Sequence, residues 1–293
     1  MRKSWAPFLI VIAAMLWGTT GTTQALAPSS AHPIAIGATR LAVGGLFLLF
    51  VVFITGKGNF ANWPIKATII ASLSMALYQP LFFSAVMTTG VAVGTVVAIG
   101  SAPILSGLIE WIFIRVRPQR VWWVSTALSI IGCLLLFANQ EAVYVDPLGI
   151  LMALGAGLTF ACYTLSSGKL VENHSSLSAV AVVFTLSAMM LSPLLFLFDM
   201  SWLTSVHGVV VALQLGVMAT GIAYLLFAQG LRNVASSTAV TLALIEPLTA
   251  ALLGVFVLNE SLSLLSWVGV LLLMLGVGTL IWASRKREIA EPA

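Results

Sequence analysis

Apolar residues gather along this chain in long, almost uninterrupted runs that short polar connections separate. Each run has about the 20 residues that an α-helix needs to cross roughly 30 Å of hydrocarbon. The pattern predicts ten such helices, at residues 6–28, 33–55, 65–88, 91–114, 121–138, 147–170, 176–199, 206–231, 235–258 and 261–283. The connections leave no room for a separate soluble domain. The expected fold class is therefore an all-α integral membrane protein.

The composition supports lipid as the solvent. Of the 293 residues, 60% are hydrophobic and only 8% are charged, whereas soluble domains carry roughly 25% charged residues. The net charge of +4 does not indicate nucleic acid, because the basic residues lie at the chain ends and in short connections without interleaved aromatic residues. We expect the lipid bilayer and a small-molecule substrate as partners, and no nucleic acid.

The basic residues divide unequally between the two sides of the predicted membrane. If the N-terminus is cytoplasmic, the external connections contain no Lys or Arg and Arg40 lies within the second helix. The other twelve fall on the cytoplasmic side: Arg2, Lys3, Lys57, Lys66, Arg115, Arg117, Arg120, Lys169, Arg232, Arg285, Lys286 and Arg287. The positive-inside rule then predicts a multi-pass protein of a bacterial inner membrane with both termini in the cytoplasm.

The N-terminus also permits a different interpretation. Arg2-Lys3, an apolar run and Ala25-Leu26-Ala27 imitate a cleaved signal peptide. Against cleavage, Pro28 would follow the cleavage site, and residues 19–24 are polar beyond a typical apolar region. We therefore expect this segment to stay as the first membrane helix.

The two halves of the chain repeat each other. Three residues of the first half recur 144 positions later: Pro103, Trp123 and Gly132 correspond to Pro247, Trp267 and Gly276. Each half holds five helices, and a unit with an odd number of spans must lie inverted relative to its copy, as in many secondary transporters. We expect residues 1–140 and 141–293 to form two inverted five-helix repeats of one transmembrane domain around a central cavity.

Several motifs carry a resemblance to a known family. The first helices of the two halves read Trp17-Gly18-Thr19-Thr20 and Phe160-Ala161-Cys162-Tyr163. With Thr39-Arg40-Leu41 and the paired prolines, the chain resembles the drug/metabolite transporter superfamily, EamA type, over essentially its whole length. Trp17 and Tyr78-Gln79-Pro80 further resemble the YddG-type exporters of aromatic amino acids. The resemblance implies a basket of helices around a central cavity, with substrate leaving the cytoplasm.

Ionisable groups within apolar helices are the sharpest pointers to function, because an unpaired one is costly in lipid. Glu246 directly precedes Pro247, which we expect to free the carbonyl of Ala243. A carboxyl group there would bind a substrate ammonium or carry a proton. The alternative is a protonated glutamate satisfied by a neighbouring helix.

Two other charges receive a structural interpretation. Arg40 lies roughly 10 Å inside the outer end of its helix. We favour a structural role for it, with attraction of a substrate carboxylate as the alternative. Glu110, near the inner end of the fourth helix, is expected to pair with Arg115 or Arg117 at the cytoplasmic surface.

Uncharged candidates are more numerous. Membrane Trp and Tyr normally form belts at the two interfaces, so aromatic residues at mid-helix suggest a cavity that stacks on aromatic or apolar side chains, with core packing as the alternative. The full set of expected substrate-binding residues is Trp17, Gln24, Tyr78, Gln79, Ser101, Tyr163, Thr220, Tyr224 and Glu246.

Prolines and glycines predict bends and close contacts. We expect four prolines to interrupt their helices and to act as hinges: Pro80, Pro103, Pro193 and Pro247. Broken helices are tolerated in membranes only against protein or a wet cavity. Gly132, Gly269 and Gly276 are instead expected to permit close helix packing.

Together these features predict an exporter of amino acids with aromatic or large apolar side chains, working by alternating access. The alternative is a broad drug or metabolite exporter of the same fold. An intramembrane enzyme is disfavoured because no Ser/His/Asp set or histidine-rich site is present, and a passive pore is a further rival. Cys133 and Cys162 lie in apolar runs without ligand spacing, so no metal or cofactor is expected.

Overall fold

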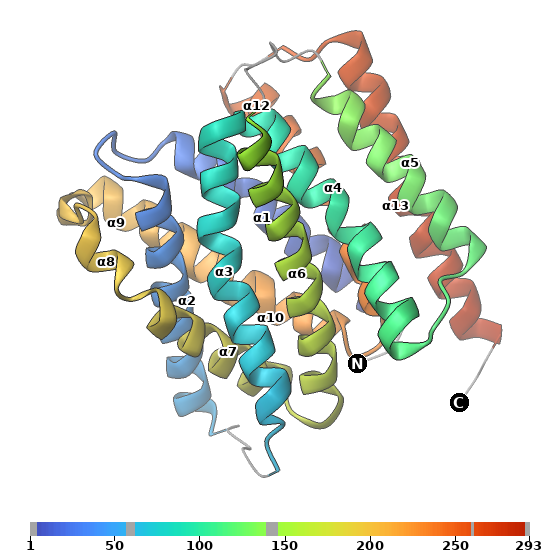
Figure 1. Ribbon diagram of the computed structural model, residues 1–293, viewed down its shortest axis with the longest axis horizontal. Coiled ribbons are helices and arrows are strands. Elements are labelled where there is room, and N and C mark those ends of the chain that lie inside the picture. Colours follow the sequence, from blue (N-terminus) through green and yellow to red (C-terminus); the bar gives the residue numbers. More distant parts are fainter. Residues whose placement is uncertain (1–4, 57–61, 139–145, 259–260, 291–293) are drawn as a thin grey trace.

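The computed structural model describes residues 5–56, 62–138, 146–258 and 261–290, and within these ranges the regular structure is entirely helical. The helices form one bundle (Figure 1). In the first half they are α1 (Ala6–Ala25), α2 (Pro33–Thr55), α3 (Ile65–Thr89), α4 (Val91–Ile109) with the π-helix η2 (Glu110–Ile114), and α5 (Arg120–Leu136).

The second half has more breaks. It contains α6 (Pro147–Asn173), α7 (Ser176–Leu191), α8 (Leu194–Leu197), the 3-10 helix η3 (Ser201–Thr204), α9 (Val206–Leu213), the π-helix η4 (Gln214–Ile222), α10 (Ala223–Gly230), α11 (Ser236–Leu242), α12 (Ile245–Leu258) and α13 (Leu264–Ala290). Each predicted span coincides with one helix or with consecutive helical pieces.

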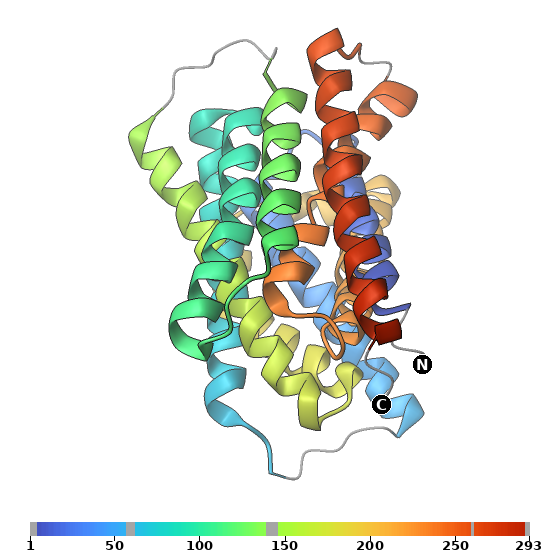
Figure 2. The same ribbon diagram turned by 90° about the vertical axis from the view of Figure 1, so that its right-hand side faces the viewer.

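The lengths fit a membrane protein. Nine helical segments of the described chain are long and apolar enough to cross a bilayer, and Arg120–Leu136 is a shorter apolar helix. The predicted fold class is confirmed. Figures 1 and 2 place both chain ends toward the end of the bundle that carries the connection between α6 and α7. Which side of the membrane this end faces stays a prediction, and Arg2, Lys3 and Lys57 lie outside the described residues.

The helix starts follow from local side chains. Pro33 and Pro147 stand in the first turns of α2 and α6, where a missing N–H costs nothing. Before them, His32 Nδ1 accepts a hydrogen bond from the Ile34 N–H at 3.3 Å, and Asp146 Oδ1 accepts one from the Leu148 N–H at 2.9 Å. These caps satisfy N–H groups that the helix itself leaves unpaired.

The α5 and α13 helices lie side by side along one flank of the bundle (Figures 1 and 2). A Cβ at Gly132 would be 2.6 Å from the Leu273 nitrogen, and one at Gly269 would be 2.6 Å from the Gly132 oxygen. A Cβ at Gly276 would be 2.3 Å from Ser129 Oγ. The prediction that these three glycines permit close helix packing is confirmed.

The prediction that four prolines interrupt helices is wrong for two of them. Pro80 and Pro103 lie inside α3 and α4, which continue through them. A helix packed among neighbours tolerates the loss of one backbone hydrogen bond. Pro193 does lie in a break, between α7 and α8, and Pro247 stands in the first turn of α12, after the break at residues 243–244.

The carbonyl of Ala243 is not free, which corrects a second expectation. It accepts a hydrogen bond from the Glu246 N–H at 2.9 Å, and Thr241 O accepts one from the Leu244 N–H at 3.1 Å. Both bonds span three residues rather than four. The tightened turn between α11 and α12 thus takes up the acceptor that the missing proline N–H would have served.

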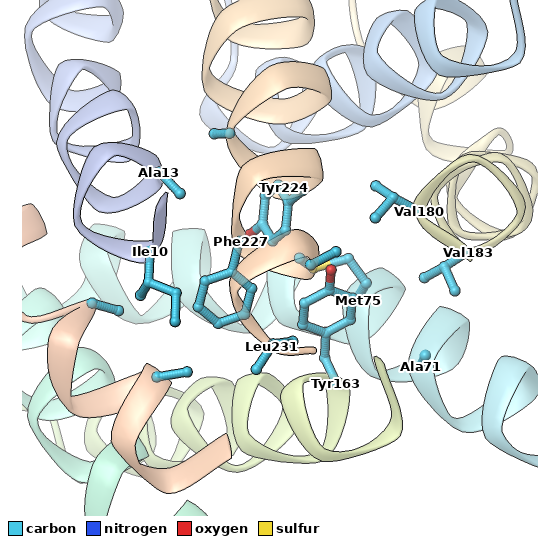
Figure 3. Packing of buried hydrophobic residues seen from close by; sticks show 14 of the residues in the cluster. Ile10, Ala13, Ala71, Met75, Tyr163, Val180, Val183, Tyr224, Phe227 and Leu231 are labelled. Carbon is cyan, nitrogen blue, oxygen red and sulfur yellow. The ribbon is translucent and has the colours of Figure 1, made fainter. Parts of the chain in front are cut away.

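A hydrophobic cluster fills the middle of the bundle. Figure 3 shows Tyr224 and Phe227 from α10 beside Tyr163 from α6, with Ile10 of α1 and Met75 of α3 packed around them. All five side chains are at most 3% exposed. This cluster supports one side of the cavity described next.

Candidate functional site

A small cavity lies at the centre of the bundle, and both halves of the chain form its wall. The lining residues come from eight helices: Trp17, Thr20, Arg40, Tyr78, Ala98, Ile99, Ala102, Phe160, Tyr224, Val240, Ala243 and Glu246. The space that the centre of a water molecule can occupy is ≈ 30 Å³. This holds about two water molecules, so a larger ligand requires the helices to move apart.

One wall of the cavity is aromatic. The Trp17 ring lies 4.7 Å from that of Tyr224 and 5.8 Å from that of Phe160, the latter edge to face. The Tyr78 ring lies 5.9 Å from Phe160. These distances are typical of favourable ring pairs. The rings therefore present a preformed surface to an apolar or aromatic group.

Two buried polar atoms on the same wall have no hydrogen-bond partner among the described residues. They are Trp17 Nε1 and Thr20 Oγ1, which lie three residues apart and so share one face of α1. Buried polar groups are normally paired, and each exception calls for an explanation. A ligand in the cavity would supply the missing partner.

Arg40 lies on the cavity wall and is anchored to η4. Its Nε donates a hydrogen bond to Thr220 Oγ1 at 3.1 Å, and one Nη donates to the Ala219 carbonyl at 3.2 Å. The side chain is 7% exposed. A guanidinium carries five N–H donors, so these two bonds leave others for the cavity. The structural role favoured from the sequence is present, together with a position suited to binding a carboxylate.

Glu246 faces the same cavity from the first turn of α12. The positive end of a helix dipole favours a carboxylate at this position. The α1 helix passes very close here, since a Cβ at Gly18 would lie 2.8 Å from the Glu246 carbonyl oxygen. The hydrogen bonds of the Arg40 guanidinium go to Thr220 and Ala219 rather than to Glu246. The cavity thus carries a cationic and an anionic group.

Four of the nine predicted binding residues line this cavity: Trp17, Tyr78, Tyr224 and Glu246. Thr220 stands behind the wall as the anchor of Arg40. Tyr163 lies one layer further out, in ring contact with Tyr224 at 5.6 Å and Phe160 at 6.2 Å.

The remaining three predicted binding residues do not line the central cavity. Ser101 Oγ donates to the Ala98 carbonyl at 3.2 Å and lies against Gly157 of α6. Gln79 is 2% exposed and faces Gly37 of α2. Gln24 is half-buried near the end of α1, outside the residues that line the cavity.

Sequence reasoning did not select Thr20 and Phe160 as binding residues, and it gave binding only as the alternative role of Arg40. Thr20 and Phe160 lie within the motifs that carry the family resemblance, and Thr20 has the helical spacing that places it on the same face as Trp17. Arg40 is the basic residue that lies deepest within a predicted apolar helix, since Lys66 and Lys169 stand at the ends of theirs. Membership of these motifs, helical spacing and a basic residue within an apolar helix are the signals that could have identified the three residues from the sequence.

The prediction that Glu110 pairs with Arg115 or Arg117 is wrong. Its side chain is 7% exposed at the start of η2, and the structure shows no ion pair between it and Arg115 or Arg117. The Arg117 guanidinium instead lies 5.8 Å from the centre of the Trp111 ring. Arg115 ends η2 with a positive φ of 61°. The chain turns there, so that neither cation reaches the carboxyl group.

Within the described ranges, no three His, Cys, Asp or Glu side chains gather as metal ligands would. The fold and the cavity instead define a class: a multi-pass membrane protein with two charged groups and an aromatic wall around a central space, as in transporters. The chain belongs to the EamA-like transporter family, whose model matches it twice, over residues 4–138 and 147–282. The resemblance to the drug/metabolite transporter superfamily is confirmed, while the narrower YddG-type resemblance stays a prediction.

Curated relatives support this assignment, and a solved structure shares the fold. The chain is 50% identical to the uncharacterized transporter YwfM of Bacillus subtilis (strain 168), over 100% of this chain and 99% of that protein. It is 28% identical to the threonine/homoserine exporter RhtA of Escherichia coli (strain K12), over 96% and 90%. A crystal structure matches the fold with a TM-score of 0.84 at 18% identity, covering 97% of this chain and 99% of the other.

Proposed function

We propose that this protein exports amino acids from the cytoplasm across a bacterial inner membrane by alternating access. The observation that carries the proposal is the pair of opposite charges on one central cavity, Arg40 and Glu246. A zwitterionic amino acid offers a carboxylate to the first and an ammonium to the second. Arginine binds carboxylates well because its planar donors match their geometry.

The aromatic wall supports a preference for aromatic or large apolar side chains. Trp17, Phe160 and Tyr224 form adjacent ring surfaces on which such a side chain can stack. A second substrate class is small hydroxylated amino acids. It is favoured by the unpaired Trp17 Nε1 and Thr20 Oγ1 on the cavity wall, and RhtA is named as an exporter of threonine and homoserine. A broad drug or metabolite exporter remains the alternative to both.

The size of the cavity supports alternating access. A space of ≈ 30 Å³ is too small for an amino acid, so binding requires rearrangement of the surrounding helices. The helix breaks at Pro193 and before Glu246 separate helical segments and offer points at which the chain can bend. In this account Pro247 and Pro193 act as hinges, and Pro80 and Pro103 bend helices that stay continuous.

The test is counterflow in proteoliposomes that contain the purified protein. Vesicles loaded with phenylalanine, tryptophan or threonine are diluted into labelled amino acid, and uptake is compared with protein-free vesicles. The proposal predicts accumulation for at least one amino acid, and loss of accumulation with Arg40→Ala. Absence of exchange for all of them, with exchange of unrelated apolar drugs, would establish the broader exporter instead.

A further inference from the structure

A second and larger cavity opens at the end of the bundle that carries both termini, the cytoplasmic end in the predicted topology. Its volume is ≈ 430 Å³, within the range of small-molecule binding pockets. Residues from both halves form its wall, among them Glu110, Arg117, Trp122, Asn233, Ser237 and Thr238. Unlike the central cavity, it accommodates a whole amino acid without rearrangement.

Glu110 is the buried acidic group of this cavity. It is 7% exposed, and no basic side chain of the described chain forms an ion pair with it. Arg117 lies on the same wall but packs near the Trp111 ring. Its carboxylate lines the open space of the cavity. A cationic ligand in the cavity could therefore pair with it without displacing a basic side chain.

The two cavities share two helices in their walls. The α4 helix places Ala102 on the central cavity, and η2, which continues it, places Glu110 on the outer one, about 12 Å apart along the helix axis. The α11 helix places Val240 on the first and Ser237 on the second, only about 4.5 Å apart. These helices pack against each other. Neighbouring parts of the same two helices therefore line both cavities.

Ser106 lies on α4 midway between the two cavities. It is fully buried, and its hydroxyl has no partner in the described part of the chain. It is one turn from Ala102 and one turn from Glu110, on the same face of the helix. A polar group at this point provides a hydrogen-bonding step between the two spaces.

We propose that the outer cavity is an entry site, in which Glu110 binds the ammonium group of the substrate before it passes between α4 and α11. This inference rests on the proposed amino-acid export. Asn233 and Thr238 offer uncharged hydrogen-bonding groups on the wall of the same cavity, and Arg117 offers a cation for the substrate carboxylate. The site selects for a primary amine, whatever side chain the substrate carries.

Binding and transport test the site and the proposed function separately. Equilibrium binding of labelled phenethylamine, which has an ammonium but no carboxylate, is measured on the purified full-length protein, on Glu110→Gln and on Glu110→Asp. Glu172→Gln is the matched control, because Glu172 is an exposed carboxylate near the end of α6 and outside the cavity. Thermal denaturation establishes that each variant is folded.

We expect Glu110→Gln to weaken phenethylamine binding about tenfold or more, since a hydrogen bond to a charged group is lost. Glu110→Asp should retain part of the affinity, and Glu172→Gln should bind like the unmodified protein. Equal binding by Glu110→Gln and the unmodified protein, or no binding by either, would overturn the entry site. Amine binding that depends on Glu110 without any amino-acid exchange would uphold the site and refute the proposed function.

Discussion

Arg40 of α2 donates a hydrogen bond from Nε to Thr220 Oγ1 at 3.1 Å, which joins the first half of the chain to the π-helix of the second. Thr220 Oγ1 in turn donates to the Leu215 carbonyl at 2.8 Å, five residues earlier. Such π segments within helices are frequently found at functional sites. The anchor fixes the guanidinium at the cavity wall, so we expect both stability and transport to depend on it.

Thr220→Val tests this anchor, because it removes the hydroxyl and keeps the branched shape. We expect the free energy of unfolding to fall by about 1–3 kcal/mol, since the buried guanidinium loses an acceptor. Thermal denaturation in detergent measures the change. Thr185→Val is the control, because the Thr185 hydroxyl is buried without a partner among the described residues and its removal should not destabilise. Equal effects of the two substitutions would refute the anchor.

The contact between α1 and α12 predicts a strong effect at Gly18. A Cβ there would lie 2.6 Å from Thr249 Cβ and 2.8 Å from the Glu246 carbonyl oxygen. We expect Gly18→Ala to destabilise by about 1–3 kcal/mol through overpacking, and to impair transport by displacing Glu246.

Gly21 of the same helix gives the matched control, since nothing lies within 4 Å of a Cβ built there. Gly21→Ala should leave stability unchanged or raise it by up to about 1 kcal/mol, because alanine favours the helix. Melting temperatures of both variants, measured in the same detergent, test the predicted difference in stability. If Gly18→Ala is as stable as Gly21→Ala, the close approach of the two helices is not present.

The aromatic wall predicts a change in selectivity. We expect Trp17→Leu to reduce transport of phenylalanine and tryptophan by about 2- to 10-fold relative to threonine, since a ring pair contributes about 0.5–1.5 kcal/mol. Competition between labelled and unlabelled amino acids gives the ratio. Trp5→Leu, at an exposed position that packs beside Phe8, should leave the ratio unchanged. An equal loss for all substrates would mean that Trp17 supports the fold only.

Glu246 is the candidate coupling group. If it carries a proton through the transport cycle, Glu246→Gln should abolish stimulation by a pH gradient, while exchange without a gradient continues at a reduced rate, because the amide keeps an acceptor for the substrate ammonium but loses the charge. Transport measured in proteoliposomes with and without the pH gradient separates proton coupling from substrate exchange. Glu172→Gln serves again as a control for the loss of a carboxylate. Unchanged rates under both conditions would remove Glu246 from coupling.

The sequence predicted the helices well because the requirement for apolar residues over a fixed thickness acts on each segment separately. The predicted 33–55 and the observed Pro33–Thr55 coincide. It also placed Trp17 and Glu246 on the cavity, since unusual residues at mid-helix have few other uses. Both predictions depend on the sequence of a single helix and not on how the helices pack together.

What the sequence could not determine is how each helix is rotated and where it breaks. Ser101 and Gln79 lie at the right depth but on faces turned toward Gly157 and Gly37, which only the packing decides. The helix breaks before Glu246 rather than at Pro247, because two hydrogen bonds that span three residues tighten the turn there. The position of Arg40 along its helix likewise did not indicate that its side chain donates a hydrogen bond to a carbonyl of η4.

The central claim is that an amino acid passes through the cavity that Arg40 and Glu246 share. A counterflow assay on the purified protein with a panel of amino acids tests it most directly. We predict saturable exchange of phenylalanine or tryptophan, with loss of exchange in Arg40→Ala and retention in Glu172→Gln. If no amino acid exchanges or competes, or if exchange persists unchanged in Arg40→Ala, the account is contradicted.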